Sequence, residues 1–225
     1  MGFSYAAAGA GTLVRTGEER ATLVRRTYAL LFTGILVTIG GALFAYTQPS
    51  VLNAVVQHPF ITFIVLFLPL LAAQRVSFPA NIGLMYLYNL GMGIFLAPVL
   101  LLYARVQPGV LGEAGILTAG MFGVLTLYAT VSKRDFSAWG GFFMVGLFVL
   151  IATSLLNLFF HSSVAQTWIA GATVFVFGGL LVYDTWRIQN KYGPDDYVPA
   201  ALNLYLDVLN IFLALLNLLG GGRRR

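Results

Sequence analysis

Residues 198–219 read VPAALNLYLDVLNIFLALLNLL, an apolar run of 22 residues that contains one acid and three asparagines. Its length matches the ~20 residues that an α-helix needs to cross ~30 Å of hydrocarbon. Lipid cannot satisfy polar groups, so a helix with such groups at intervals must lie against other helices. The run therefore predicts a membrane-spanning helix that is shielded from lipid by a surrounding bundle.

Six further apolar runs of similar length precede this one, and short polar connections separate them. None of the runs alternates as a β-barrel strand would, so a helical bundle is expected. The six runs cover residues 27–46, 51–73, 79–104, 111–131, 138–160 and 164–190. We predict an all-α integral membrane protein with a mobile N-terminal tail over 1–26, seven transmembrane helices over 27–220 and a basic tail over 221–225.

The composition agrees with a chain that lies mostly in lipid. Of 225 residues, 59% are hydrophobic and 9% are charged, and the mean hydropathy is +0.84. Soluble domains contain about 25% charged residues, so a soluble catalytic domain is excluded. The chain has no cysteine, which excludes disulfides, thiolate nucleophiles and thiolate metal sites.

Thirteen bases against eight acids give a net charge of +5. The bases lie at the ends of the apolar runs, so we expect membrane lipid, and not nucleic acid, as their partner. An N-terminus inside the cell places nine bases inside and four outside, which predicts a cytoplasmic N-terminus. The basic C-terminal tail is then outside, unless one apolar run is re-entrant and both ends lie inside; we favour seven full crossings. The inside set is Arg15, Arg20, Arg25, Arg26, Arg75, Lys133, Arg134, Arg187 and Lys191, and the outside set is Arg105 with Arg223, Arg224 and Arg225.

Two acids fall inside apolar runs: Asp184 in LVYDTWR and Asp207 in LYLDVLN. A charge at the bilayer centre costs about 2.5–3.5 kcal/mol, so both are candidate functional residues, although a structural contact between helices is the alternative. At ~1.5 Å per residue, Asp184 lies ~9 Å and Asp207 ~12 Å from helix ends on the same side. We expect the two carboxyl groups to meet, to share a proton and to titrate as a pair.

A polar stripe at helical spacing follows the last apolar run: Asn203, Asp207, Asn210 and Asn217. Asparagine often forms hydrogen bonds between membrane helices, which is one interpretation. Because the four residues share one row, we favour the other, in which the stripe lines a wet pathway. Arg75, at the end of the second run, is either a snorkelling base or a latch that pairs with Asp184.

The chain resembles the Bax inhibitor-1 family, also called the transmembrane Bax inhibitor motif (TMBIM) family, from about Thr27 to Gly220. The most specific segments are YDT at 183–185 and ALNLYLDVLN at 201–210. SKRDFS at 132–137 and the position of Arg75 support the resemblance. It implies a bacterial plasma (inner) membrane protein of seven helices, in which the other six surround the last.

The resemblance also implies a pH-sensitive calcium leak channel. In this chain Asp184 and Asp207 would be the pH sensor and Arg75 the latch. Calcium, as the transported ion, would bind transiently to Asp184 and Asp207, and no resident cofactor is expected. Calcium prefers about six to eight oxygen ligands, so such a site is loose, which suits permeation better than storage.

Two other functions stay open. The first is a non-conducting regulator of other membrane proteins, including a membrane-bound ATP-dependent protease to which bacterial relatives are linked. The second is an intramembrane aspartyl protease, since two acids on neighbouring helices can form a catalytic dyad. The setting of Asp207 in Tyr-Leu-Asp, among bulky residues, disfavours the protease, and we predict that the chain is not an enzyme.

Overall fold

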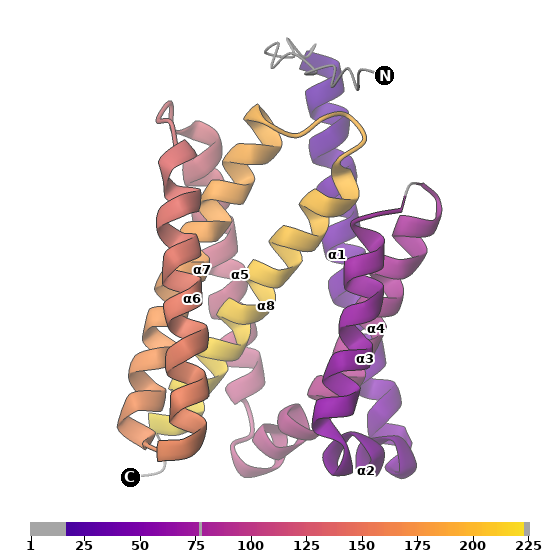
Figure 1. Cartoon of the computed structure of the whole chain (residues 1–225), viewed down its shortest axis with the longest axis vertical. Helices are drawn as coiled ribbons and strands as arrows, with labels where there is room; N and C mark the ends of the chain where they lie inside the picture. The colour runs from indigo at the N-terminus through magenta and orange to yellow at the C-terminus, as the bar shows by residue number, and fades with distance from the viewer. Residues whose placement is uncertain (1–16, 77, 223–225) are drawn as a thin grey trace, which may run out of the picture.

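The computed structural model describes residues 17–76 and 78–222, and that part of the chain forms helices and no strands (Figure 1). The helices are α1 (Gly17–Thr47), α2 (Pro49–Gln57), α3 (Pro59–Ala73), α4 (Ala80–Val106), α5 (Val110–Val131), α6 (Ser137–Phe160), α7 (Ser163–Asn190) and α8 (Tyr197–Gly222). Six of them, all except α2 and α3, are long and apolar enough to cross a membrane. Large apolar side chains such as Phe142, Phe148 and Phe159 are exposed, as lipid contact requires. The chain is an integral membrane protein.

The apolar run at 51–73 is not one straight helix. It forms α2 and α3, which meet at an angle of 100°. His58 has a non-helical backbone between them, with φ −128° and ψ 55°. Proline disfavours the helical conformation of the residue before it, so Pro59 explains the break at His58. Residues 17–76 and 78–222 therefore contain six continuous candidate spans, and a seventh only if the bent pair counts as one.

The predicted N-terminal tail is wrong in its boundary. Residues 17–26 are helical, because α1 begins at Gly17 with Glu18 and Glu19 in its first turn. Acids at that position interact favourably with the positive end of the helix dipole. Residues 1–16 lie outside the described part of the chain, as do residues 223–225 of the predicted basic tail. Gly221 and Gly222 still belong to α8.

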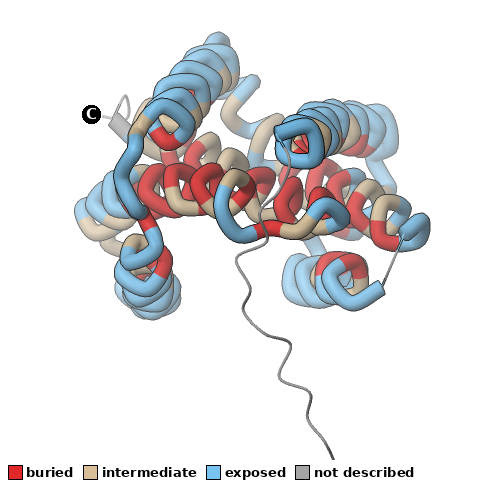
Figure 2. Tube along the Cα trace, turned by 90° about the horizontal axis from the view of Figure 1, so that it is seen from above, coloured by how far each residue is buried: buried red, intermediate tan, exposed pale blue. Residues whose placement is uncertain are grey.

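The last helix lies inside the bundle, with α7 beside it. α8 packs against α7, α1, α5 and α4, whereas α3 packs on α4 and α6 packs on α7. Seen from above, the buried positions form a band through the middle of the molecule, and the outer helices are exposed (Figure 2). The expectation that six helices surround α8 is thus modified, since α3 and α6 pack mainly on its neighbours.

The helix starts and connections divide between two ends of the bundle (Figure 1). We call one the basic end, which is formed by the start of α1 and by the connections α3–α4, α5–α6 and α7–α8. Eight bases of the described residues lie there, against Arg105 at the opposite end. The eight are Arg20, Arg25, Arg26, Arg75, Lys133, Arg134, Arg187 and Lys191.

Glycine allows α1 and α4 to pack closely. A Cβ atom added at Gly93 would overlap the carbonyl oxygen of Thr38 and lie 2.9 Å from the backbone nitrogen of Ala42. Both of those atoms belong to the backbone of α1, which cannot rotate aside. The packing of α1 on α4 therefore requires a residue without a side chain at position 93.

Gly93→Ala is expected to destabilise the protein by about 2 kcal/mol, because the methyl group must push α1 and α4 apart. Thermal unfolding in detergent measures this effect. The matched control is Gly83→Ala on the same helix, where an added Cβ meets no atom within 4 Å. Alanine favours a helix over glycine by about 1 kcal/mol, so Gly83→Ala should not lower the melting temperature. Equal melting temperatures for the two variants would contradict the packing argument.

Candidate functional site

The structure brings Asp184 of α7 and Asp207 of α8 together. Asp184 is 7% exposed and Asp207 is 3% exposed. Their side chains are within hydrogen-bonding reach of each other. The second half of α7 is buried on nearly every side, and α8 lies inside the bundle, so both carboxyl groups are removed from lipid and from bulk water.

The pair requires a proton when its carboxyl groups bond to each other. Two ionised carboxylates are both acceptors, so a hydrogen bond between them exists only if one is protonated. Asp207 Oδ2 is buried, and no N–H or O–H group of the described residues donates to it. A proton shared with Asp184 would supply the missing donor, which is the arrangement that the sequence predicts.

Arg187 is the ion-pair partner of Asp184. Its Nη1 lies 2.9 Å from Asp184 Oδ1, one helical turn away on α7. Its guanidinium also lies 4.6 Å from the ring centroid of Tyr192 and 5.4 Å from that of Tyr183. Cation–π contacts at these distances add to the ion pair and hold the arginine against the end of α7.

The predicted ion pair between Arg75 and Asp184 is absent. Arg75 follows α3 and is exposed, and no salt bridge joins these two described residues. The physical reason is position, because α3 packs on α4 and not on α7. Arg187 was counted only as a base at a helix end, although its spacing of three residues from Asp184 is one at which helical side chains meet.

Tyr192 connects this ion pair to α8. Its hydroxyl oxygen accepts a hydrogen bond of 2.8 Å from Asn203 Nδ2. Burial, together with the negative charge of Asp184, raises the pKa of Tyr192 to about 12, so its hydroxyl is neutral at ordinary pH. We call Asp184, Arg187, Tyr192 and Asn203 the arginine clamp. It joins the end of α7, the α7–α8 connection and the start of α8.

The other asparagines of the stripe are half-buried. Asn210 Nδ2 donates to the carbonyl oxygen of Leu206 on its own helix, at 2.8 Å. Asn217 is also half-buried, one turn before the exposed Gly221. The Asn203 amide therefore bonds to the α7–α8 connection, whereas the Asn210 amide nitrogen bonds to the backbone of its own helix. Of the stripe, Asp207 faces Asp184 of α7, and Asn203 bonds to Tyr192 in the α7–α8 connection.

A second buried polar group lies between α1, α4 and α8, and the sequence did not single it out. The hydroxyl groups of Thr38 and Tyr205 are 2.7 Å apart. Tyr88 and Asn89 of α4 are fully buried, and neither the Tyr88 hydroxyl nor the Asn89 amide has a hydrogen-bond partner among the described residues. These residues come from three separate apolar runs, so no local pattern marks them.

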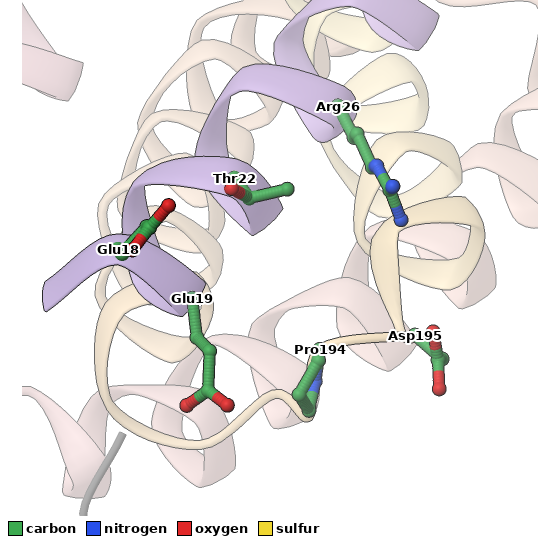
Figure 3. Close-up of a pocket in the computed structure, with 6 residues that line it drawn as sticks. All are labelled: Glu18, Glu19, Thr22, Arg26, Pro194 and Asp195. Carbon is green, nitrogen blue, oxygen red and sulfur yellow. The ribbon is translucent and has the colours of Figure 1, made fainter. Parts of the chain in front are cut away.

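A surface pocket of about 380 Å³ lies at the basic end. Glu18, Glu19 and Arg26 line it from α1, and Pro194 and Asp195 line it from the α7–α8 connection (Figure 3). The guanidinium of Arg26 lies 5.4 Å from the ring centroid of Tyr197. The pocket holds charges of both signs at the surface, so the buried pair, and not this pocket, is the candidate site.

The described residues contain no group of three His, Cys, Asp or Glu side chains that could hold a metal ion. The pair supplies two carboxyl groups, fewer than the about six to eight oxygens that a tightly bound calcium takes. Any cation here would need backbone, amide or water oxygens as well. The donors are hard oxygens, the chemistry that suits calcium.

Comparison with known proteins identifies the family. The family model described as "Inhibitor of apoptosis-promoting Bax1" matches residues 20–224. The chain belongs to the Bax inhibitor-1 family. The match contains both Asp184 and Asp207, so the site lies within the region that is typical of this family.

Relatives in the Bax inhibitor-1 family come from animals, fungi and bacteria. Mouse protein lifeguard 4 is 32% identical over 206 residues, covering 89% of this chain and 85% of its own length. Bax inhibitor 1 of Schizosaccharomyces pombe is 33% identical over 210 residues, covering 89% and 77%. An uncharacterised protein of Helicobacter pylori is 32% identical over 209 residues, covering 90% and 88%.

Proposed function

We propose that this protein is a pH-sensitive calcium leak channel gated by Asp184 and Asp207. One observation carries the proposal: two buried carboxyl groups on adjacent central helices lie within hydrogen-bonding reach, and one of them is paired with Arg187. Buried acids in membrane helices are costly, and they typically mark ion or proton pathways. Membership of the Bax inhibitor-1 family supports a membrane function of this kind.

The arginine clamp provides a mechanism for gating. When Asp184 is ionised, it binds Arg187, which packs on Tyr192, and Tyr192 accepts a hydrogen bond from Asn203. These contacts tie α7 to α8 at the basic end. When a proton enters the pair, Asp184 can bond to Asp207 and no longer attracts Arg187. The clamp then loses its central contact, and the basic end opens.

Arg187 takes the role that the family resemblance implied for Arg75. The distance of 2.9 Å between Arg187 and Asp184 supports this assignment. Arg75 is exposed, and it would have to cross from α3 to reach the same carboxylate. We propose that Arg187 holds the closed state.

The proposed orientation places the basic end in the cytoplasm. Eight bases of the described residues lie at that end and Arg105 lies at the other, which agrees with the positive-inside rule. The N-terminus and the arginine clamp would then face the cytoplasm, and the membrane would be the bacterial inner membrane. We propose seven crossings, in which α2 and α3 together form the second.

A non-conducting regulator is the second candidate. The printed names of the fission yeast relative and of the family model describe inhibitors of Bax, which is a statement about a protein partner. On this proposal the chain would regulate other membrane proteins, such as a membrane-bound protease. A protease activity of its own is disfavoured, because Asp207 is 3% exposed and leaves no room for a substrate strand.

Purified protein in liposomes should pass calcium at a rate that changes with pH. Asn210→Leu is expected to lower the flux without unfolding the protein, because Asn210 lines the proposed pathway and its amide bonds only to its own helix. Thr153→Leu on the outer helix α6 is the control, since its hydroxyl also bonds within its own helix. Calcium-sensitive dye inside the liposomes measures both variants. Liposomes of folded wild-type protein that pass no calcium between about pH 5 and 8 would favour the regulator instead.

A further inference from the structure

A groove between α5 and α6 has α7 as its floor. Both helices pack on α7, and the short connection over residues 132–136 joins them at the basic end. The groove has a volume of about 700 Å³. Its lining is almost entirely apolar, and Phe142 and Phe175 on its rim are 67% and 65% exposed. In a membrane protein, such a groove faces lipid.

The depth of the groove matches one leaflet of a bilayer. Its lining begins near the connection, with Tyr128 three residues before the end of α5 and Ala138 one residue after the start of α6. It reaches Met121, which at ~1.5 Å per residue is ~15 Å from the end of α5. Half of a ~30 Å hydrocarbon core has the same thickness. An acyl chain from the leaflet at the basic end would fill the groove along its length.

Cations surround the head of the groove. Lys133 and Arg134 are exposed in the connection that closes it. The Nζ atom of Lys191 lies 5.7 Å from the ring centroid of Trp186, which packs with the groove residue Val182. The acid nearest to these bases in the sequence is Asp135, whose Oδ1 accepts a hydrogen bond from the Ser137 nitrogen and whose carboxylate interacts electrostatically with Lys191. Three bases against this one acid leave a net positive charge. The head of the groove is therefore positively charged where a lipid headgroup would lie.

We infer that this groove is a binding site for an anionic phospholipid. One acyl chain lies on α7 between α5 and α6, and the phosphate lies against Lys133, Arg134 and Lys191. A lipid fits better than an apolar protein helix, because it brings a negatively charged headgroup together with an acyl chain. An apolar helix would bring no negative charge to the bases at the head of the groove.

Trp139 lines the groove and reports on its occupant. With Trp168→Phe and Trp186→Phe in place, Trp139 is the single tryptophan, because the chain has three. Lipids with brominated acyl chains quench tryptophan fluorescence on contact. Bases near a membrane surface attract anionic lipid, so we expect brominated phosphatidylglycerol to be preferred to brominated phosphatidylcholine at Trp139 by about tenfold. Lys133→Gln with Arg134→Gln should abolish most of that preference.

Two controls separate this site from the general lipid surface. Arg105→Gln at the opposite end should leave the preference unchanged. Leu127→Trp, in a background without other tryptophans, places a probe beside Tyr128 on an exposed surface outside the groove, and it should show little preference. Equal quenching of Trp139 by both lipids would overturn the inference. So would quenching at position 127 without quenching at Trp139, since a protein segment would then occupy the groove.

Discussion

Asp184→Asn and Asp207→Asn are each expected to flatten the pH dependence of calcium flux between about pH 5 and 8. In the proposed mechanism, the wild-type pair gains or loses a shared proton over its titration, and each change makes or breaks the contact that Asp184 forms with Arg187. Asparagine at 184 cannot ionise, so the ion pair never forms and the basic end stays loosened at every pH. Asparagine at 207 removes the partner that competes with Arg187 for Asp184.

The matched control for this prediction is Asp195→Asn. Asp195 is an exposed acid in the surface pocket at the same end, and it makes no contact with the buried pair. Its variant should keep the wild-type pH profile. Flux is measured with a calcium dye in liposomes at matched protein content. If the profiles of both buried-site variants follow the wild type, the pair is structural and the pH sensor lies elsewhere.

Much of the proposed site could be predicted from the sequence, because the pairing of the two acids follows from their similar depths along two neighbouring helices. Asp184 and Asp207 were expected at similar distances from helix ends on one side, and the structure places their side chains within hydrogen-bonding reach. Arg187 was missed because bases near helix ends were read as topology signals. Its spacing of three residues from Asp184 was the available signal.

Other features of the bundle were harder to predict because they depend on packing between distant segments. The bend between α2 and α3 is an exception, because its cause is local: Pro59 disfavours a helical His58, which a hydropathy pattern does not detect. The close approach of α1 to α4 rests on Gly93, which only the pairing of these helices reveals. The buried Tyr88 and Asn89 likewise become a group only when α1, α4 and α8 assemble.

Arg187→Gln is expected to open the basic end at high pH, where the proposed mechanism keeps the wild type closed. The variant loses the ion pair with Asp184 and the contact with the Tyr192 ring. The side chain of Arg187 is 31% exposed, so solvent screens part of this interaction. A remaining contribution of about 1.4 kcal/mol to the closed state would shift the ratio of open to closed protein about tenfold. Arg75→Gln should have no such effect, because Arg75 makes no ion pair with Asp184.

A cysteine at Ala201 measures opening independently of ion flux. Ala201 is fully buried at the start of α8, and the chain has no cysteine of its own. Modification of Ala201→Cys by a water-soluble thiol reagent at pH 8 should be about tenfold faster with Arg187→Gln than without it. At pH 5 the modification rates with and without Arg187→Gln should converge, because in the proposed mechanism the shared proton has already broken the contact of Asp184 with Arg187. In a protein that already carries Asp184→Asn, adding Arg187→Gln should not change the modification rate of the cysteine further, since the two residues act through one contact. Additive effects of the two substitutions, or an equal effect of Arg75→Gln, would show that the closed state does not depend on the arginine clamp.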